Sequence, residues 1–405
     1  MGCRVARTLG QLGEIAGGAT PSTKKPSYWN GDIPWLSPKD LTNYAFRYIG
    51  HGERSITRSG YDNSSTVLLP AGTVLFSSRA PIGYVAIASN PVCTNQGFKS
   101  VVPYDGTDSL FLYYLLKFNR VRIEGLGSGT TFKEVSATTM RGIEVDVPRT
   151  IDEQRRIASV LDSIDSKIET NARLNGYLAE LAQTLYNDWF RDFGHWDGRM
   201  PSHWESGVLG DYVTVKRGGS PRPIQEYLSN EGLRWLKIAD VSSINGPYIL
   251  EIKEHIKEEG LRRTVYLEPG SLVLSNSATP GIPKILSIGT CIHDGWLYFP
   301  QSEFTNEWLY CYFLNVRQEL VRMANGSVFQ NLKTDIVKNF EVIRPDDETL
   351  ASFQKTIAPL FGLMETRQQE SKQLAELRDA LLPKLMSGEI DVTRIDLTQL
   401  NSHLT

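Results

Sequence analysis

The chain has 405 residues, 40% apolar and 22% charged, an ordinary composition for a globular protein of two or three domains. Its four cysteines form no CxxC or Cys/His cluster, which argues against a zinc site and a disulfide framework. It contains neither an apolar run of 18 residues nor a signal-peptide core, so the sequence predicts a cytoplasmic protein without a membrane partner.

The net charge of −3 averages over unlike parts of the chain. Residues 1–150 carry 16 Lys and Arg against 11 Asp and Glu, whereas residues 201–345 carry 15 against 16. Most of the acidic excess lies in the segments 151–200 and 346–405. This division is compatible with a polyanion on the globular parts and a different partner on the acidic segments.

An internal duplication with an offset near 200 residues organises the chain. Trp35 and Cys93 recur as Trp235 and Cys291, inside segments of matching pattern. A period this long is no solenoid repeat, so it predicts one domain-plus-helix unit used twice. The matching segments are LGEIAGGATPS (12–22) with LGDYVTVKRGGSP (209–221), IPWLSPKDL (33–41) with LRWLKIADV (233–241), LPAGTVLFSSRAPIG (69–83) with LEPGSLVLSNSATPG (267–281), CTNQGF (93–98) with CIHDGW (291–296), and GSGTTFKEVS (127–136) with NGSVFQNLK (325–333).

Each globular copy mixes strand, turn and helix patterns, which predicts the α+β class. TVLF (73–76), YVAIA (84–88), SLVLS (271–275) and KILSIG (284–289) are the predicted strands, and LFLYYLLKFN (110–119) and WLYCYFLNVRQEL (308–320) the predicted helices. The predicted boundaries are a globular domain at 1–150, a long helix at 151–194, a linker at 195–207, a globular domain at 208–345, a long helix at 346–388 and a tail at 389–405.

The two predicted long helices carry heptad-like apolar stripes. In the first, the stripe from Ile157 to Ile168 shifts phase near Asn171 and continues from Leu174 to Leu185. About 40 helical residues span roughly 60 Å, more than a domain of this size needs for its own core. We therefore predict that the helices pair antiparallel as a spacer; the alternative is that each helix caps its own domain.

Motifs of catalysis are absent or weak. The chain has no GxxxxGK[ST], GxSxG or HExxH motif and no Asp/Asn-Pro-Pro-aromatic run. GLGSG (125–129) only partly matches a dinucleotide fingerprint and is interpreted as a turn. Asp240 with Glu251 and Lys253 resembles a nuclease metal site, but only Asp240 has a counterpart, Asp40, so we interpret the match as chance. We predict no catalytic residue and no metal on this chain.

Polar and basic residues concentrate in loops at equivalent positions of both copies. Lys and Arg can hold phosphates, while Ser, Thr, Asn and Gln can contact base edges. These loops predict a nucleic-acid interface, although a structural role for any single residue stays open. The candidates are Thr23, Lys24, Lys25, Lys39, Ser78, Arg79, Thr131, Lys133, Lys216, Arg217, Arg222, Lys237, Asn276, Ser277, Gln330 and Lys333.

Over its whole length the chain resembles the specificity subunit of type I restriction–modification enzymes. The second domain departs more, because GSVFQNLK replaces GTTFKEVS and FQKTIA (353–358) lacks the EQ–RIA pattern of the first helix. The resemblance rests on LGEIAGGATPS with IPWLSPKDL, on GSGTTFKEVS, on EQRRIASVLDSIDSKIE (153–169), and on the helix ends LYNDWFRDF (185–193) and LRDALLPKLMSGEIDV (377–392).

The resemblance implies a pseudo-twofold architecture of two target recognition domains alternating with two long helices. Each domain would read one half of a split, asymmetric sequence in double-stranded DNA, and the antiparallel helices would set the gap between the halves. The helices would also hold two methyltransferase subunits, with restriction (translocase and endonuclease) subunits outside them. Those partners would bring S-adenosylmethionine, ATP and magnesium and perform base flipping, whereas this chain would bind no cofactor. Trp189 and Phe190 are candidate anchors for a partner, with packing against the following domain as an equal alternative.

Two other functions stay open from the sequence alone. One is a single-chain restriction or modification enzyme with an unrecognised active site. The other is a coiled-coil scaffold whose globular ends bind protein or glycan.

Overall fold

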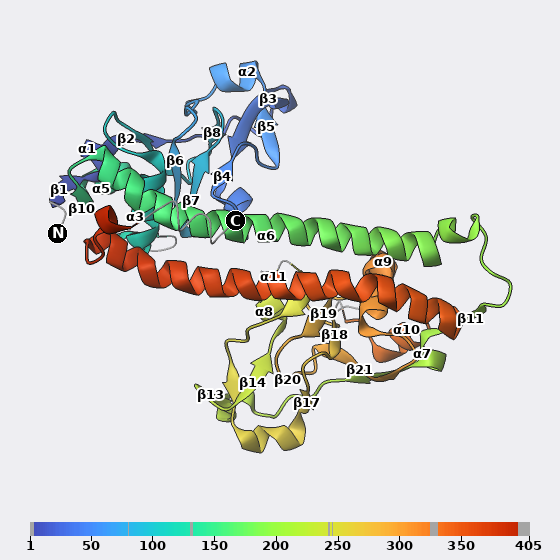
Figure 1. Cartoon of the computed structure of the whole chain (residues 1–405). Helices are drawn as coiled ribbons and strands as arrows, with labels where there is room; N and C mark the ends of the chain where they lie inside the picture. The colour runs from blue at the N-terminus through green and yellow to red at the C-terminus, as the bar shows by residue number, and fades with distance from the viewer. Residues whose placement is uncertain are drawn as a thin grey trace. The chain divides into compact units, whose positions relative to one another are not determined.

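The computed structural model describes residues 4–79, 81–129, 133–241, 244, 246–324 and 331–395 (Figure 1). The chain falls into two compact units. Unit 1 joins the segment up to Glu169 to the segment from Gln373 onward, and unit 2 is Thr170–Lys372. Each unit therefore combines one copy of the duplication with parts of both long helices.

Unit 1 contains a five-stranded sheet of order β2-β9-β6-β7-β4 and a three-stranded sheet of order β5-β3-β8. Its first strand, β1, pairs antiparallel with β10, which closes the domain. The strands are β1 (Arg4–Thr8), β2 (Gly13–Gly17), β3 (Trp29–Leu36), β4 (Tyr48–Ile49), β5 (Arg54–Ile56), β6 (Val74–Ser78), β7 (Ile82–Ala88), β8 (Cys93–Thr94), β9 (Lys99–Pro103) and β10 (Glu144–Pro148), and the helices are α1 (Leu9–Leu12), α2 (Arg58–Asp62), α3 (Ser109–Phe118), α4 (Arg120–Gly125) and α5 (Ala137–Gly142).

The core of unit 1 forms where α3 meets the central strands. The Asp108 carboxylate caps α3 by accepting a hydrogen bond from the Phe111 amide at 2.9 Å. The run from Phe111 to Leu116 is buried, and every residue of β6 is buried as well. This helix and these strands match the predicted elements at 110–119, 73–76 and 84–88.

Unit 2 repeats the plan of unit 1. Its sheet order β12-β21-β18-β19-β15 corresponds to β2-β9-β6-β7-β4. Trp235 lies opposite Cys291 in parallel strands, as Trp35 lies opposite Cys93. The strands are β11 (Glu205–Val208), β12 (Val213–Arg217), β13 (Leu228–Ser229), β14 (Leu233–Leu236), β15 (Tyr248–Ile249), β16 (His255–Ile256), β17 (Val265–Leu267), β18 (Leu272–Ser275), β19 (Pro283–Leu286), β20 (Thr290–Ile292), β21 (Trp296–Ser302) and β22 (Glu341–Arg344), and the helices are α7 (Leu209–Tyr212), α8 (Ile238–Val241), α9 (Asn306–Ala324) and α10 (Thr334–Lys338).

The two long helices are α6 (Ile151–Phe190) and α11 (Asp347–Ser387). In unit 1, Leu161 of α6 and Leu385 of α11 belong to one buried cluster that also includes the domain core. In unit 2, Asn175 of α6 donates a hydrogen bond to the Met364 carbonyl of α11 at 3.2 Å. Further along, Phe190 of α6 packs on Phe353 of α11. The helices thus pair antiparallel within each unit, and each domain also uses them to complete its own core.

Two predicted boundaries differ from the structure. α6 ends at Phe190 rather than at 194, because a tight turn follows it. The predicted linker 195–207 contains the buried Trp204 and the start of β11, which pairs with β22, so it is part of the second domain. Within the described part of the predicted tail, Val392 is buried in the unit 1 core.

The second half of the α6 stripe was also misplaced by one residue. Leu181 is 46% exposed, whereas the neighbouring Ala182 is 1% exposed. Asn171 and Asn175 are buried in this part of the helix, so polar side chains occupy the seam after the phase slip. Among the described helices, none is long and apolar enough to cross a membrane.

Candidate nucleic-acid interface

The connection between β6 and β7 in unit 1 has the same hydrogen bonds as the connection between β18 and β19 in unit 2. The Ser77 hydroxyl donates to the Pro81 carbonyl and accepts from the Tyr84 amide, both at 2.8 Å. The Ser275 hydroxyl donates to the Thr279 carbonyl at 2.6 Å and accepts from the Ile282 amide at 2.9 Å. A single serine therefore fixes the shape of this loop in each domain.

Two further loops are tied to the residue after that serine. In unit 1, Ser78 donates its amide to the Gly97 carbonyl at 2.7 Å and accepts from the Val135 amide at 3.0 Å. In unit 2, the Asn276 amide donates to the Gly295 carbonyl at 2.9 Å, and the Asn276 carbonyl accepts from the Leu332 amide at 2.7 Å. The same backbone network thus gathers three loops at one edge of each domain.

A fourth loop joins this edge through a glycine. The amide of Ala19 donates to the Thr94 carbonyl at 2.9 Å, and a Cβ at Gly18 would lie 2.1 Å from that oxygen. In unit 2, a Cβ at Gly218 would lie 2.3 Å from the His293 carbonyl. Only glycine permits such a close approach of two backbones. Each domain therefore presents four loops together, and we refer to this edge as the recognition edge.

At the recognition edge of unit 1, cations surround Glu134. Its carboxylate lies 3.0 Å from the Lys99 ammonium and 3.7 Å from the Arg79 guanidinium. Thr20 adds a hydrogen bond to Gln96 at 2.6 Å. The edge therefore offers both ionic and neutral polar groups, as a surface that contacts phosphates and base edges requires.

At the recognition edge of unit 2, the corresponding carboxylate is Asp294, and it comes from a different loop. It accepts a hydrogen bond from the Ser220 hydroxyl at 2.6 Å and lies 3.6 Å from Arg217 and 3.4 Å from Arg222. Partial burial opposes ionisation of Asp294, but the Ser220 hydrogen bond and the nearby arginines outweigh it and hold the pKa below its usual value. Asp294 is therefore an anion that holds two arginines at the loop edge.

The predicted residues differ in exposure, and the structure does not describe two of them. Arg79, Lys237 and Ser277 are half-buried, Ser78 and Asn276 are buried, and Thr131 and Gln330 lie outside the described residues. Lys39 and Lys237 are paired with Glu53 and Glu254, respectively. The exposed candidates are Thr23, Lys24, Lys25, Lys39, Lys133, Lys216, Arg217, Arg222 and Lys333.

Ser78 and Asn276 are not placed to touch a base. Both residues are buried. The Ser78 hydroxyl donates to the Gly97 carbonyl at 3.1 Å, and the side-chain amide of Asn276 donates to the Asp294 carbonyl at 3.1 Å. Because their polar groups are used to hold loops together, they shape the recognition edge from below. This corrects their prediction as direct DNA contacts.

Trp189 and Phe190 are core residues rather than exposed anchors. They are 8% and 5% exposed, and the Phe190 ring lies 4.8 Å from the Phe353 ring and 5.7 Å from the Trp308 ring. Aromatic rings at these separations stabilise a core through burial and edge-to-face contact. Packing against the second domain, the alternative left open by the sequence, is what the structure shows.

Some residues at the recognition edge were missed from the sequence. Ser77 and Ser275 stand at equivalent positions of LFSSRAPIG and LSNSATPG, so their retention in both copies was a usable signal. Glu134 and Asp294 gave no such signal, because a carboxylate is not an expected group at a surface that binds a polyanion.

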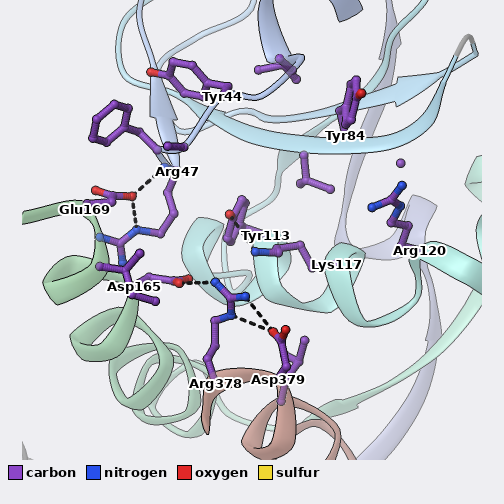
Figure 2. A pocket seen from close by; sticks show the side chains of 17 residues that line it. Tyr44, Arg47, Tyr84, Tyr113, Lys117, Arg120, Asp165, Glu169, Arg378 and Asp379 are labelled. Atoms are coloured by element: carbon purple, nitrogen blue, oxygen red, sulfur yellow. Dashed lines mark hydrogen bonds and ion pairs between the residues drawn. The ribbon is translucent and has the colours of Figure 1, made fainter. Parts of the chain in front are cut away.

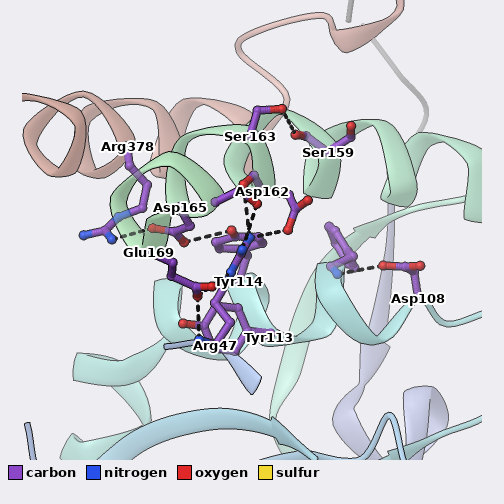
Figure 3. Close-up of polar contacts among 12 residues, drawn as sticks. Arg47, Asp108, Tyr113, Tyr114, Ser159, Asp162, Ser163, Asp165, Glu169 and Arg378 are labelled. Atoms are coloured by element: carbon purple, nitrogen blue, oxygen red, sulfur yellow. Dashed lines mark hydrogen bonds and ion pairs between the residues drawn. The ribbon is translucent and has the colours of Figure 1, made fainter. Parts of the chain in front are cut away.

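Unit 1 also contains a buried ionic network where the domain meets α6 (Figure 3). Arg47 is 5% exposed; its guanidinium lies 2.9 Å from Glu169 and contacts Asp162 and Ser166. Although burial alone would lower the pKa of Arg47, the hydrogen bond to Glu169 raises it well above its usual value. In unit 2, α11 instead contacts the equivalent strand through a neutral side chain: Gln368 accepts a hydrogen bond from the Tyr248 amide at 3.3 Å and donates one to the Tyr248 carbonyl at 3.1 Å.

Beside this network lies a pocket of about 430 Å³ (Figure 2). Arg378 crosses it to Asp165 at 2.7 Å and to Asp379 at 2.8 Å, and Glu169 is held by Arg47. The carboxylates of the pocket are therefore neutralised by partners, an arrangement that stabilises the junction. In the described part of the chain, no group of three or more His, Cys, Asp or Glu side chains is arranged to hold a metal ion.

Two similar α+β domains, each with a loop-rich recognition edge and each packed on parts of two long helices, define a protein built for recognition at two sites. The chain belongs to the family described as the type I restriction modification DNA specificity domain, whose model matches residues 5–178 and again 201–376. It is thus a DNA-recognition subunit that works with the other subunits of a restriction–modification enzyme, in which catalysis belongs to those other subunits. Membership supports this function and not the two alternatives left open by the sequence.

Similar proteins agree with this assignment. The chain is 33% identical to the type I restriction enzyme MjaIX specificity subunit of Methanocaldococcus jannaschii, over 96% of this chain and 94% of that protein. It is 30% identical to the EcoR124I/EcoR124II specificity subunit of Escherichia coli over 46% of each chain. The crystal structure of a type I S subunit from M. genitalium shares the fold, with a TM-score of 0.60 and 18% identity over 95% of this chain and 96% of that chain.

Proposed function

We propose that each domain of this chain reads one half of a bipartite, asymmetric target in double-stranded DNA. The main support is that the two recognition edges share a backbone framework but carry different polar side chains. Ser77 and Ser275 make the same hydrogen bonds, whereas the central carboxylate is Glu134 in one domain and Asp294 in the other, from different loops. A common framework with different polar groups suits two domains that bind the same kind of ligand and read different sequences.

The long helices are proposed to set the spacing between the two half-sites. Their support is the length of α6 (Ile151–Phe190) and of α11 (Asp347–Ser387), which run beyond either domain core. Insertion of matched whole helical turns in both helices should lengthen the spacer of the target and leave both half-sites unchanged. A change in either half-site would contradict this role.

The partner subunits are proposed to be two methyltransferase subunits, with restriction subunits attached to them. In this proposal S-adenosylmethionine, ATP and magnesium bind to the partners, and this chain holds no cofactor. A cytoplasmic location stays a prediction. Mass measurement of the assembled complex with and without restriction subunits tests the proposed number of methyltransferase subunits.

The experiment that tests the two-domain reading is methylation sequencing of genomic DNA in cells that carry the assembled system. A bipartite motif with a fixed spacer is the expected result. Replacing residues 20–145 with the equivalent segment of another specificity subunit should then change one half-site and leave the other. Alteration of both half-sites, or methylation without a bipartite motif, would overturn the proposal.

A further inference from the structure

An arginine stands at the same place of the duplicated helix in both units. The helix begins at Ser109 in unit 1 and at Asn306 in unit 2, an offset of 197 residues. At the same offset, Arg120 corresponds to Arg317. Unit 1 breaks this helix at Asn119 into α3 and α4, whereas α9 is continuous, so the arginine is retained although the helix differs.

Both arginines lie against the loop that the conserved serine fixes. Gly83, the second residue of β7, and Gly281, which precedes β19, follow the turn of that loop with φ angles of +98° and +79°. A Cβ at Gly83 would lie 2.6 Å from Cγ of Arg120, and a Cβ at Gly281 would lie 3.1 Å from Cγ of Arg317. The absent glycine side chain therefore leaves room for the stem of each arginine beside its recognition edge.

Among the described residues, no carboxylate pairs with either arginine. In the described part of the chain, Arg120 and Arg317 have no hydrogen bond or ion pair through their side chains, and Nε of Arg317 is buried without a partner. In Figure 2, Arg120 carries no dashed line, whereas Arg47 and Arg378 both reach carboxylates. Leaving a buried donor unpaired costs about 1–3 kcal/mol, so Nε of Arg317 would gain from an external partner, and the exposed Arg120 is open to one.

The helix dipole does not explain why both copies have an arginine at this position, Arg120 and Arg317. Another retained pair of cations, Arg141 and Lys338, stands in the last turn of α5 and α10, where a helix dipole favours positive charge. Arg120 is instead the first residue of α4, the end at which a cation is unfavourable, and Arg317 lies inside α9.

We propose that Arg120 and Arg317 bind DNA backbone phosphates, one in each half-site, and so position each domain without reading sequence. The inference rests on the proposed function. Two half-sites of different sequence still share the same phosphate backbone, so a cation needed for the backbone should be retained in both copies. Cations that read bases should diverge, and Arg79 and Arg217 do so, with Ser277 and Gly17 at the equivalent positions.

The test uses the assembled complex of this chain with its methyltransferase subunits and a duplex that carries the methylated target. Arg120→Met and Arg317→Met remove the charge and keep an unbranched stem to pack on Gly83 or Gly281. Each variant should weaken binding on specific and non-specific duplexes alike and lower the slope of log K against log salt by about 0.9, with the double variant losing about twice that. The methylated sequence should stay the same.

Arg122→Met and Arg322→Met are the matched controls, because both arginines are exposed on the same helices and neither is retained in the other copy. They should leave the salt slope unchanged. A wild-type slope in the Arg120 and Arg317 variants, with or without a lower melting temperature, would overturn the inference, and so would an altered methylated sequence. Failure of the proposed function is distinguishable, since the wild-type complex itself would then recognise no bipartite target.

Discussion

Asp165 of α6 lies 2.7 Å from Arg378 of α11, and both side chains are largely buried within unit 1. The other oxygen of Asp165 accepts a hydrogen bond from the Tyr114 hydroxyl at 2.8 Å, which links the helix pair to α3 (Figure 3). Arg378 interrupts the apolar stripe of α11, because at this position the helix forms an ion pair with α6 in place of an apolar contact. The ion pair fixes which residues of the two helices meet.

Asp165→Asn should destabilise the protein by about 3 kcal/mol, because it leaves the Arg378 guanidinium buried beside a neutral amide. The measurement is the free energy of unfolding from denaturant titration. Asp379→Asn is the control, since Asp379 also contacts Arg378 but its side chain is 65% exposed. Equal losses of unfolding free energy in the two variants would show that burial does not strengthen the contribution of the Asp165 contact.

Phe190→Ala should cost about 3–4 kcal/mol, because it opens a cavity in the aromatic core of unit 2. Leu181→Ala on the exposed side of α6 should change the unfolding free energy by less than about 0.5 kcal/mol. Denaturant titration of both variants separates the core role from the anchor role predicted from the sequence. A stable Phe190→Ala variant with weakened partner binding would restore the anchor role.

Lys284 predicts a pH dependence in unit 2. Burial lowers the pKa of Lys284 to about 8, while its ammonium donates to the Ile244 carbonyl at 3.0 Å. Between pH 8 and the unfolded pKa near 10.5, the unfolded chain binds more protons than the folded chain at this residue. The contribution of Lys284 to the free energy of unfolding should therefore rise with pH across that window.

Comparison with Lys284→Met isolates this effect from the titration of other groups. The free energy of unfolding of the wild type, relative to that of the variant, should rise by up to about 3 kcal/mol as the pH rises from 8 to 10.5. This difference should be constant below pH 7. Unfolding free energies at a series of pH values provide the check. A difference that does not vary with pH would mean that Lys284 keeps an ordinary pKa.

The sequence predicted the features that repeat and missed those that depend on contacts. Strands such as β6 and helices such as α3 and α9 followed from strong apolar patterns and from turn residues. The buried positions of α6 beyond Asn171 could not be predicted in this way, because both the domain core and α11 pack on the same helix face. The helix presents Ala182 and Tyr186 to that core and leaves Leu181 exposed.

The candidate interface shows the same division. Loop positions could be predicted because both copies place polar residues there, but the direction of each side chain could not. Ser78 and Asn276 point inward, since the loops they hold need their hydrogen bonds. The roles of Glu134 and Asp294 emerge only when the partner cations are placed around them.

Asp294→Asn should relax sequence discrimination in one half-site. The carboxylate holds Arg217 and Arg222, and an arginine reads a guanine well only when its planar fork is held in position. Replacement by the neutral amide keeps the Ser220 contact possible but removes the charge that attracts both guanidiniums. Overall DNA affinity should be retained or increased, because a negative charge is lost from a surface that binds a polyanion.

Methylation sequencing with the assembled system measures this outcome base by base. Asp294→Asn should lower discrimination by about 5- to 150-fold at one or two bases of a single half-site, equivalent to the 1–3 kcal/mol carried by a good bidentate contact. Glu134→Gln in unit 1 should relax the other half-site, because Glu134 holds Arg79 and Lys99 there. Relaxation of the same half-site by both variants would show that the two carboxylates do not serve separate domains. An unchanged motif in both would show that neither positions a base-reading group.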